Sequence, residues 1–338
     1  MAQPAADADK VTIRPLQSSD LETVVAMDAV FEGRTRRDYI ETRLRAAQQQ
    51  PERHAQFGAI CDNELAGYMT ARLVSGDFGQ RQASLRIELM GLRPELARAG
   101  VGRRLFEALQ GWGQRRGAVE ARTVASWKRS GLLAWFAAMG FELTNSLVLE
   151  GRVGNSALYG ERDGPLSIEP GAGPGREVDF GRSEANDQER FARHGADVRA
   201  MTTADLDAVV RIDREQTGGE RREDLAARLA EAERDRAIRA SLCAHCDGTV
   251  VGYLMARVDL GDFGRPEPVA VIDTLGVDAA YAHRGIGRAL MAQLFANLGA
   301  LRVDAVETSV QLTQTALLGF LVACGFGNSP RLAFRRAL

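Results

Sequence analysis

The sequence predicts an α/β protein of two similar domains, each with a mixed, mostly antiparallel sheet flanked by helices. Two observations support this fold class. Segments that alternate as strands do, and segments with the apolar period of helices, occur in the order strand, two helices, three antiparallel strands, helix, strand, helix, strand. The same order occurs a second time farther along the chain. Such an order gives a sheet with both parallel and antiparallel pairs.

The second set of elements follows the first by 185 residues, which is the difference between positions 273 and 88. Residues 88–92 read Glu-Leu-Met-Gly-Leu and residues 273–277 read Asp-Thr-Leu-Gly-Val, while the pair Gly67-Tyr68 returns as Gly252-Tyr253. A register without gaps over most of two halves indicates an internal duplication. We therefore expect four parts: a loose tail over 1–10, a first domain over 11–153, a linker rich in glycine and proline over 154–195, and a second domain over 196–338.

The first domain begins with residues 11–14, which alternate apolar and polar side chains as a short strand does. Ser18 and Asp20 precede an amphipathic segment, which indicates a capped helix, and a second helix ends before Pro51. Glycine and Asp-Asn turns then separate three apolar segments. These are expected to be antiparallel strands over 57–61, 65–74 and 84–92.

After the third of these strands, a glycine-rich loop leads into an amphipathic helix that reaches Gly117. A strand over 121–126 and a helix stopped at Gly140 follow. Residues 146–150 are then the last strand of the first half. The second half repeats this order from residue 197, and residues 332–334 supply a final strand that ends the chain.

The composition excludes several classes of protein. A hydrophobic content of 45% and a charged content of 26% are ordinary for a globular protein. The net charge of −2 gives no support for a nucleic-acid partner, and no apolar run is long enough to cross a membrane. The first ten residues lack the basic and apolar regions of a secretory signal. We therefore expect a cytoplasmic protein with no nucleic-acid or membrane partner.

One cysteine pair invites a metal or redox interpretation. Cys243 and Cys246 form a lone C-x-x-C motif, typical of a redox pair or half of a zinc site. The alternative is that both lie in a strand, since Cys246 corresponds to Cys61 in the first half. The sequence has no second ligand pair, so we expect no metal.

The two glycine-rich loops, residues 98–103 and 283–288, carry the clearest chemical signal. Each follows a strand and runs directly into a helix. Glycines let a backbone approach a ligand closely, and the start of a helix adds free amides and the positive end of its dipole. With arginines beside them, these loops are suited to bind a phosphate or pyrophosphate. The alternative is an ordinary turn between a strand and a helix; P-loop and dinucleotide motifs do not fit.

These residues together resemble the central signature of the GNAT superfamily of acyl-CoA-dependent N-acetyltransferases. That signature is an apolar strand of the form I-[E/D]-x-L-x-V, followed by Q/R-x-x-G-x-G/A and a helix. Residues 272–277 with Gly285-Ile286-Gly287 match it, as do residues 87–92 with Gly100-Val101-Gly102. The resemblance covers nearly all of the chain outside the tail and the linker. It implies two GNAT-like (acyl-CoA N-acyltransferase) domains that use acetyl-CoA and no metal.

In such a domain, acetyl-CoA lies in a V-shaped opening where the strand with the acidic residue splays from its parallel neighbour. The resemblance implies that the pantetheine arm pairs with backbone groups around Met90, Gly91 and Leu92, or around Leu275, Gly276 and Val277. It places the pyrophosphate on two sets of loop residues. These are Arg98, Ala99, Gly100, Val101, Gly102 and Arg103 in the first half, and His283, Arg284, Gly285, Ile286, Gly287 and Arg288 in the second.

The expected reaction is direct attack of a primary amine on the thioester within a ternary complex. A protonated amine must first lose a proton, and Glu88 or Asp273 is the expected acceptor. The alternative for these carboxylates is a structural ion pair, for Glu88 with Arg86 or Arg72. Many family members have a tyrosine that protonates the departing thiolate, but the corresponding residues are Phe136 and Leu321. Another donor such as Tyr281, or water, has to replace it.

The second half is the better catalytic candidate, because its loop is more basic and its strand is closer to the signature. The first position of the loop motif departs from the family in both halves, where it is Ala97 and Ala282. A second hypothesis is a catalytically degenerate protein that binds or senses acyl-CoA, or serves as a scaffold. For the enzyme we expect an amine-bearing acceptor, either a small molecule or a peptide, and a monomer or a homodimer.

Overall fold

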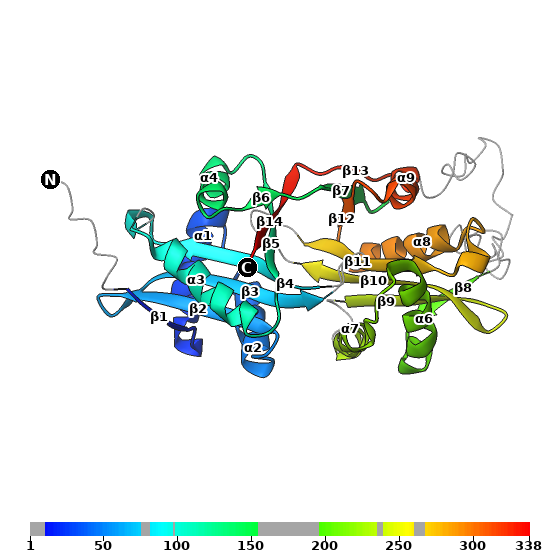
Figure 1. The fold of residues 1–338 in the computed structure, drawn as a ribbon, viewed down its shortest axis with the longest axis horizontal. Coiled ribbons are helices and arrows are strands. Elements are labelled where there is room, and N and C mark those ends of the chain that lie inside the picture. The colour runs from blue at the N-terminus through cyan, green and yellow to red at the C-terminus, as the bar shows by residue number, and fades with distance from the viewer. Residues whose placement is uncertain (1–10, 76–81, 97–98, 155–195, 235–238, 260–267) are drawn as a thin grey trace, which may run out of the picture.

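The computed structural model describes residues 11–75, 82–96, 99–154, 196–234, 239–259 and 268–338. The predicted tail, nearly all of the predicted linker, Ala97 and Arg98 lie outside the described residues. Two seven-stranded mixed sheets lie side by side, each flanked by helices (Figure 1). The predicted α/β fold class is therefore confirmed.

The elements of the first half follow the predicted order, and one short strand is added in each half. The prediction missed β6 and its counterpart β13, which are only two residues long. The structure has β1 (Thr12–Pro15), α1 (Leu21–Glu32), α2 (Arg37–Gln49), β2 (His54–Cys61), β3 (Glu64–Ser75), β4 (Ala83–Leu92), α3 (Val101–Gln114), β5 (Glu120–Ser126), α4 (Ser130–Ala138), β6 (Glu142–Leu143) and β7 (Ser146–Arg152).

The second half repeats these elements at the spacing found in the sequence. A 3₁₀ turn precedes the first helix of each half, over Ser18–Asp20 and Thr203–Asp205. The elements are β8 (Asp197–Ala200), α6 (Leu206–Thr217), α7 (Arg222–Arg234), β9 (Arg239–Cys246), β10 (Thr249–Asp259), β11 (Val269–Val277), α8 (Ile286–Ala300), β12 (Ala305–Gln311), α9 (Thr315–Ala323), β13 (Gly327–Asn328) and β14 (Arg331–Ala337).

The last strands of the two halves are exchanged, which corrects the sequence-based assignment. The sheet orders are β1-β2-β3-β4-β5-β14-β6 and β13-β7-β12-β11-β10-β9-β8. β7, expected as the last strand of the first half, pairs along its whole length with β12 of the second. β14 pairs in the same way with β5 of the first half, and Figure 1 shows both strands in the opposite halves.

The exchanged strands are part of the hydrophobic cores. Phe334 of β14 is buried in the core of the first half, where its ring lies 5.1 Å from that of Phe136. Leu149 of β7 is likewise buried in the core of the second half. Full burial of a large apolar side chain is worth about 1.5–3 kcal/mol. Each half therefore needs a strand of the other to complete its core.

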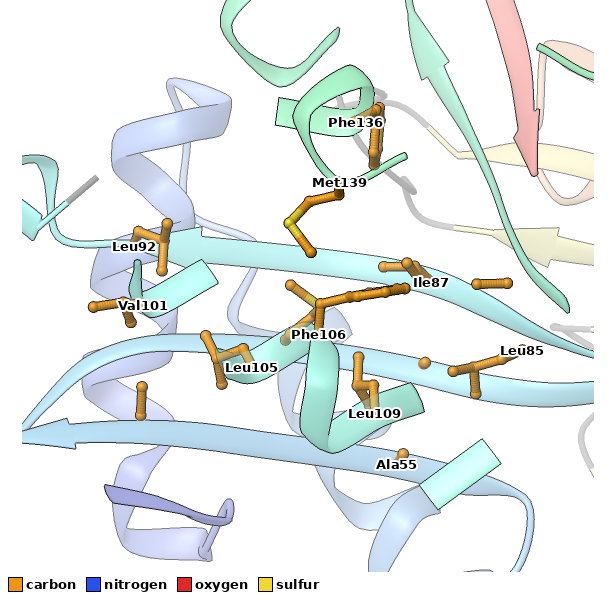
Figure 2. Close-up of a cluster of buried hydrophobic side chains, with 14 of the residues drawn as sticks. Ala55, Leu85, Ile87, Leu92, Val101, Leu105, Phe106, Leu109, Phe136 and Met139 are labelled. Atoms are coloured by element: carbon orange, nitrogen blue, oxygen red, sulfur yellow. The ribbon is translucent and has the colours of Figure 1, made fainter. Parts of the chain in front are cut away.

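Each sheet has one apolar core on each face. In the first half, Leu105, Phe106 and Leu109 of α3 point onto Leu85 and Ile87 of β4 (Figure 2). The apolar face expected for this helix is therefore confirmed. A separate cluster under α1 and α2 covers the opposite face, and α6 and α7 do the same in the second half.

Two further expectations can be compared with the described part of the chain. None of its helices is long and apolar enough to cross a membrane. Within the same residues, no three His, Cys, Asp or Glu side chains are grouped to hold a metal ion. Cys243 is buried in β9, and burial raises the pKa of its thiol to about 12. Both cysteines of the C-x-x-C pair lie in this strand, which is the structural alternative weighed against a metal or redox site.

Candidate functional site

The parallel strands at the centre of each sheet separate after a short stretch of pairing. β4 and β5 pair only from Ser84 to Arg86, although β4 continues to Leu92. β11 and β12 pair only from Val269 to Val271. At the point of separation a threonine hydroxyl donates to the neighbouring strand, from Thr308 Oγ1 to the carbonyl of Ile272 at 3.3 Å. The expected separation of these strands is therefore present in both halves.

Both predicted catalytic carboxylates lie at a β-bulge. Thr70 is opposite Leu89 and Ala71 is opposite Ile87, which leaves Glu88 as the extra residue of β4. Asp273 has the same place in β11, because the register against β10 shifts at the corresponding position. A bulge bends the strand and redirects a side chain. The duplicated bulge fixes the direction in which each carboxylate points.

Each of these carboxylates is buried between two arginines. Glu88 is 2% exposed, with Arg43 Nη1 at 3.1 Å and Arg72 Nε at 3.5 Å from its Oε1. Asp273 is also 2% exposed; Arg228 Nη1 lies 3.1 Å from its Oδ2, and Arg257 contacts its Oδ1. The ion pair with Arg72, weighed above as an alternative for Glu88, is present. The role of the two carboxylates as proton acceptors stays a prediction.

A second polar cluster lies beside the bulge, and the sequence analysis did not identify it. The hydroxyl of Tyr253 donates to Asp213 Oδ1 at 2.5 Å and lies 3.1 Å from Thr274 Oγ1. Arg221 Nε donates to Asp213 Oδ2 at 2.8 Å. Burial raises the pKa of the Tyr253 hydroxyl, and the charge of Asp213 raises it further. The hydroxyl therefore stays protonated and acts as a donor to Asp213.

The first half has the same cluster at the same spacing. Tyr68 donates to Asp28 Oδ1 at 3.1 Å, and Arg36 Nε donates to Asp28 Oδ2 at 2.8 Å. Burial raises the pKa of Tyr68 well above its ordinary value, and the charge of Asp28 adds to the effect. All three residues return 185 positions later. A search of the duplication for repeated charged residues would have found this cluster.

The tyrosine rings explain one of the repeated glycines. A Cβ atom on Gly276 would lie 2.4 Å from Cε1 of Tyr253, and one on Gly91 would lie 2.3 Å from Cε1 of Tyr68. Carbon atoms in contact are normally about 3.5–4.0 Å apart. These two positions, predicted as cofactor-binding, therefore need glycine to admit the tyrosine ring of the adjacent strand.

The separated strands of the second half open into a cleft of about 590 Å³. Residues of α6, β10, β11, the glycine loop and the starts of α8 and α9 line it. Asp213, Tyr253 and Thr274 line the cleft, as does Tyr281. So do eight of the predicted cofactor-binding residues: Leu275, Gly276, Val277, His283, Gly285, Ile286, Gly287 and Arg288. The ninth, Arg284, is exposed beside it, with its guanidinium 5.1 Å from the centre of the Tyr281 ring.

Each glycine loop has a left-handed glycine directly before its helix. Gly285 has a φ of 82° and directly precedes the first residue of α8, and Gly100 has a φ of 78° directly before α3. Such left-handed angles favour glycine, and they begin the helix with its free amides directed at the loop. In the first half, Met90, Gly91 and Leu92 end β4, while Ala99, Gly100, Val101, Gly102 and Arg103 form the corresponding turn and helix start.

Phe136 and Leu321 are core residues. Phe136 is 0% exposed and Leu321 is 1% exposed, so neither side chain faces solvent. Tyr253 and Tyr281, by contrast, both line the cleft of the second half.

Comparison with known proteins identifies the family. The model of the acetyltransferase (GNAT) family matches residues 22–141 and 206–326. A search of curated proteins found no match. Among solved structures, a GCN5-related N-acetyltransferase from Sphaerobacter thermophilus has a TM-score of 0.58 at 18% identity, over 97% of this chain and 96% of that one.

Two further solved structures have the same fold. A tandem GNAT protein from the clavulanic acid biosynthesis pathway has a TM-score of 0.58 at 16% identity, over 97% of this chain and 98% of that one. A glucosamine N-acetyltransferase region of a fungal multi-domain β-N-acetylglucosaminidase has a TM-score of 0.62 at 14% identity, over 96% of this chain and 38% of that one. Because the family model matches most of the chain in two copies, the protein belongs to the acetyltransferase (GNAT) family as a tandem N-acetyltransferase.

Proposed function

We propose that the protein transfers an acetyl group from acetyl-CoA to a primary amine by direct attack within a ternary complex, and that the second half does so. The observation that carries this proposal is the cleft of about 590 Å³, which joins the free edge of β11 to the glycine loop. Its volume lies within the range of about 300–1,000 Å³ typical of ligand sites.

The residues of this cleft fit acetyl-CoA, which supplies an acyl group activated as a thioester. The pairing of β11 with β12 stops at Val271, so the backbone of Leu275 and Gly276 can pair with the amides of pantetheine on that side, whereas the carbonyl of Val277 accepts from Gln216. The amides at the start of α8, with Arg284 and Arg288, suit the pyrophosphate. The charge of the loop and the helix dipole act on the same group.

The transfer forms an N–C bond, breaks the C–S bond and moves one proton from nitrogen to sulfur. Of the carboxylates at the bulge and the buried cluster, Asp213 lines the cleft, whereas Asp273 lines a small cavity of about 90 Å³ between the halves. We therefore assign proton exchange at the acyl end to Asp213 and Tyr253. Asp273 then acts as a positioning residue that holds Arg228 and Arg257.

The test is release of free CoA thiol from acetyl-CoA over a panel of primary amines. Arg288→Glu reverses a charge in the proposed pyrophosphate site, and Arg103→Glu makes the same change at the matching position of the first half. Loss of one charged hydrogen bond, about 1.5–3 kcal/mol, corresponds to an increase of about 10- to 150-fold in KM. We expect this increase for Arg288→Glu only; an equal effect of both variants would refute the assignment to the second half.

One set of observations favours the second candidate, a protein that binds acyl-CoA without turnover. Glu88 and Asp273 are both held in ion pairs, and Phe136 and Leu321 provide no hydroxyl. In that case acetyl-CoA binds and Arg288→Glu weakens the binding, but no amine releases thiol. Calorimetry beside the thiol assay separates the two functions.

A further inference from the structure

The two halves differ at the mouth of the cofactor cleft. In the second half, Thr217 ends α6 and Gln314 precedes α9, and both line the same cleft. The corresponding residues of the first half are Glu32 and Arg129. They stand at the same two places, the end of α1 and the residue before α4.

In the first half, these two places are joined directly. Arg129 Nη2 lies 2.8 Å from Glu32 Oε2 and also donates to the carbonyl of Phe31 at 3.2 Å. The Glu32 side chain is only 5% exposed, and Arg36 lies 3.9 Å from its other oxygen. The contact therefore ties two segments that are 97 residues apart in the sequence. A partly buried ion pair of this kind is screened less by solvent than an exposed one.

In the second half, the corresponding side chains make other contacts. Gln314 Oε1 accepts a bond from the amide of Gln311 at 3.3 Å, within its own loop. Thr217 Oγ1 accepts from the amide of Gly219 at 3.3 Å. Next to Thr217, Gln216 donates to the carbonyl of Val277 on β11 at 2.7 Å. Thr217 and Gln314 thus bond within their own segments, whereas Gln216 reaches from α6 to β11.

The aromatic ring over the second loop glycine does not distinguish the halves. A Cβ atom on Gly102, the second glycine of the first loop, would lie 2.9 Å from Nε1 of Trp135, and one on Gly287 would lie 3.1 Å from Cζ of Phe320. Phe320 nevertheless lines the open cleft of the second half. The difference between the halves therefore lies in the contact between Glu32 and Arg129.

We propose that the ion pair between Glu32 and Arg129 closes the cofactor cleft of the first half, so that these positions decide which half takes acyl-CoA. Thr217 and Gln314 are the open counterparts. The inference rests on the proposed function in one respect, namely that acyl-CoA is the ligand of the open cleft. It assigns a role to residues outside the glycine loop and outside the acidic bulge.

The experiment exchanges these residues between the halves. Glu32→Thr/Arg129→Gln gives the first half the residues of the second, and isothermal titration calorimetry of the full chain with CoA then counts the sites. We expect one site per chain in the wild type and two in the variant. In the Arg288→Glu background, the same double change is expected to restore a single site. The matched control, Glu22→Thr/Arg37→Gln, removes an exposed ion pair between α1 and α2, and the count is expected to stay at one.

If the first variant does not fold, the reverse exchange, Thr217→Glu/Gln314→Arg, tests whether these residues close the cleft. It is expected to weaken CoA binding at least about tenfold, which is 1.4 kcal/mol. Two sites in the wild type, or one site in a folded Glu32→Thr/Arg129→Gln variant, would overturn the proposal. Absence of binding to the wild type, with one site in this variant, would instead remove the proposed function and leave the role of the ion pair intact.

Discussion

The contact between Gly276 and Tyr253 predicts that two matched variants lose stability alike, while only one of them loses activity. In Gly276→Ala the new Cβ would lie 2.4 Å from Cε1 of Tyr253, so the ring has to move by more than about 1 Å to reach an ordinary carbon–carbon distance. Such a movement breaks the hydrogen bond of 2.5 Å from Tyr253 to Asp213. Gly91→Ala makes the same change against Tyr68, at 2.3 Å.

The cost follows from two contributions. Overpacking of a tight core costs about 1–3 kcal/mol, and loss of a buried hydrogen bond to a charged group costs about 1.5–3 kcal/mol. Because the ring relaxes partly, we expect the lower end of their sum, about 3 kcal/mol, for each variant. For a domain of this size, that corresponds to a fall in Tm of about 6–12 °C.

The assay combines thermal unfolding with thiol release. Both alanine variants are expected to unfold at lower temperature, but only Gly276→Ala is expected to lower kcat/KM, because Tyr253 lines the cleft. Tyr253→Leu, combined with Gly276→Ala, removes the clash but also the hydrogen bond to Asp213, so it is expected to recover only the overpacking part of the Tm loss and none of kcat. A Tm for Gly276→Ala within about 1 °C of the wild type would refute the packing argument, and an equal loss of activity in Gly91→Ala would refute the assignment to the second half.

Three other predictions concern the charged groups and the exchanged strands. Asp273→Asn removes one carboxylate charge from the buried Arg228 and Arg257, of which Arg228 keeps its pair with Asp224 at 2.8 Å, so denaturant unfolding is expected to show a loss of about 3 kcal/mol, the lower end for breaking a buried pair; an unchanged midpoint would contradict the ion-pair account. Although burial raises it, the pKa of Asp205 is lowered to about 2 by hydrogen bonds from Arg199 and Thr202. Its contribution to stability is therefore complete above the unfolded pKa of about 3.9 and is lost as the pH falls toward 2, so the Tm difference between wild type and Asp205→Asn is expected to disappear over that range. Removal of residues 331–338 is expected to speed amide exchange in β5 more than in β12, because β14 pairs with β5; the opposite order in hydrogen-exchange mass spectrometry would contradict the exchange of strands.

The sequence was sufficient to predict most of the fold because the duplication repeats each signal. Both halves contain a strand, a glycine loop and an amphipathic helix at the same spacing. This repetition leaves few other ways to assign the elements. The partners of the last strands were not predictable in this way. β7 and β14 have equivalent positions in the two copies, so their periodicity is compatible with either sheet. Only the burial of Phe334 and Leu149 in the opposite cores distinguishes the pairings.

The candidate site was predictable where it depends on local sequence. The glycine loop and the bulged strand are local patterns, and eight of their residues in the second half line one cleft. Of the arginines that hold Glu88 and Asp273, Arg72 on the neighbouring strand was considered from the sequence, but Arg43 of α2 and Arg228 of α7 were not, because local patterns do not show which face these helices turn to the sheet. The ion pair of Glu32 with Arg129 was missed for a different reason: it occurs in one half only, and a search for repeated residues passes over it.

The duplication also separates what the fold requires from what the ligand requires. Both halves have the bulged carboxylate between two arginines, and both have a tyrosine that donates to an aspartate beside a glycine. These groups are present even where Arg129 joins Glu32 across the mouth of the cleft, so their presence does not depend on an open cofactor site. Their duplication alone therefore assigns no catalytic role to either group, and only the lining of the cleft by Asp213 and Tyr253 supports the proposal made for the second half. In our proposal, access is controlled by two of the positions that differ between the halves, Glu32 against Thr217 and Arg129 against Gln314. The first half contributes to the second through β7, which is buried in the sheet that carries the open cleft.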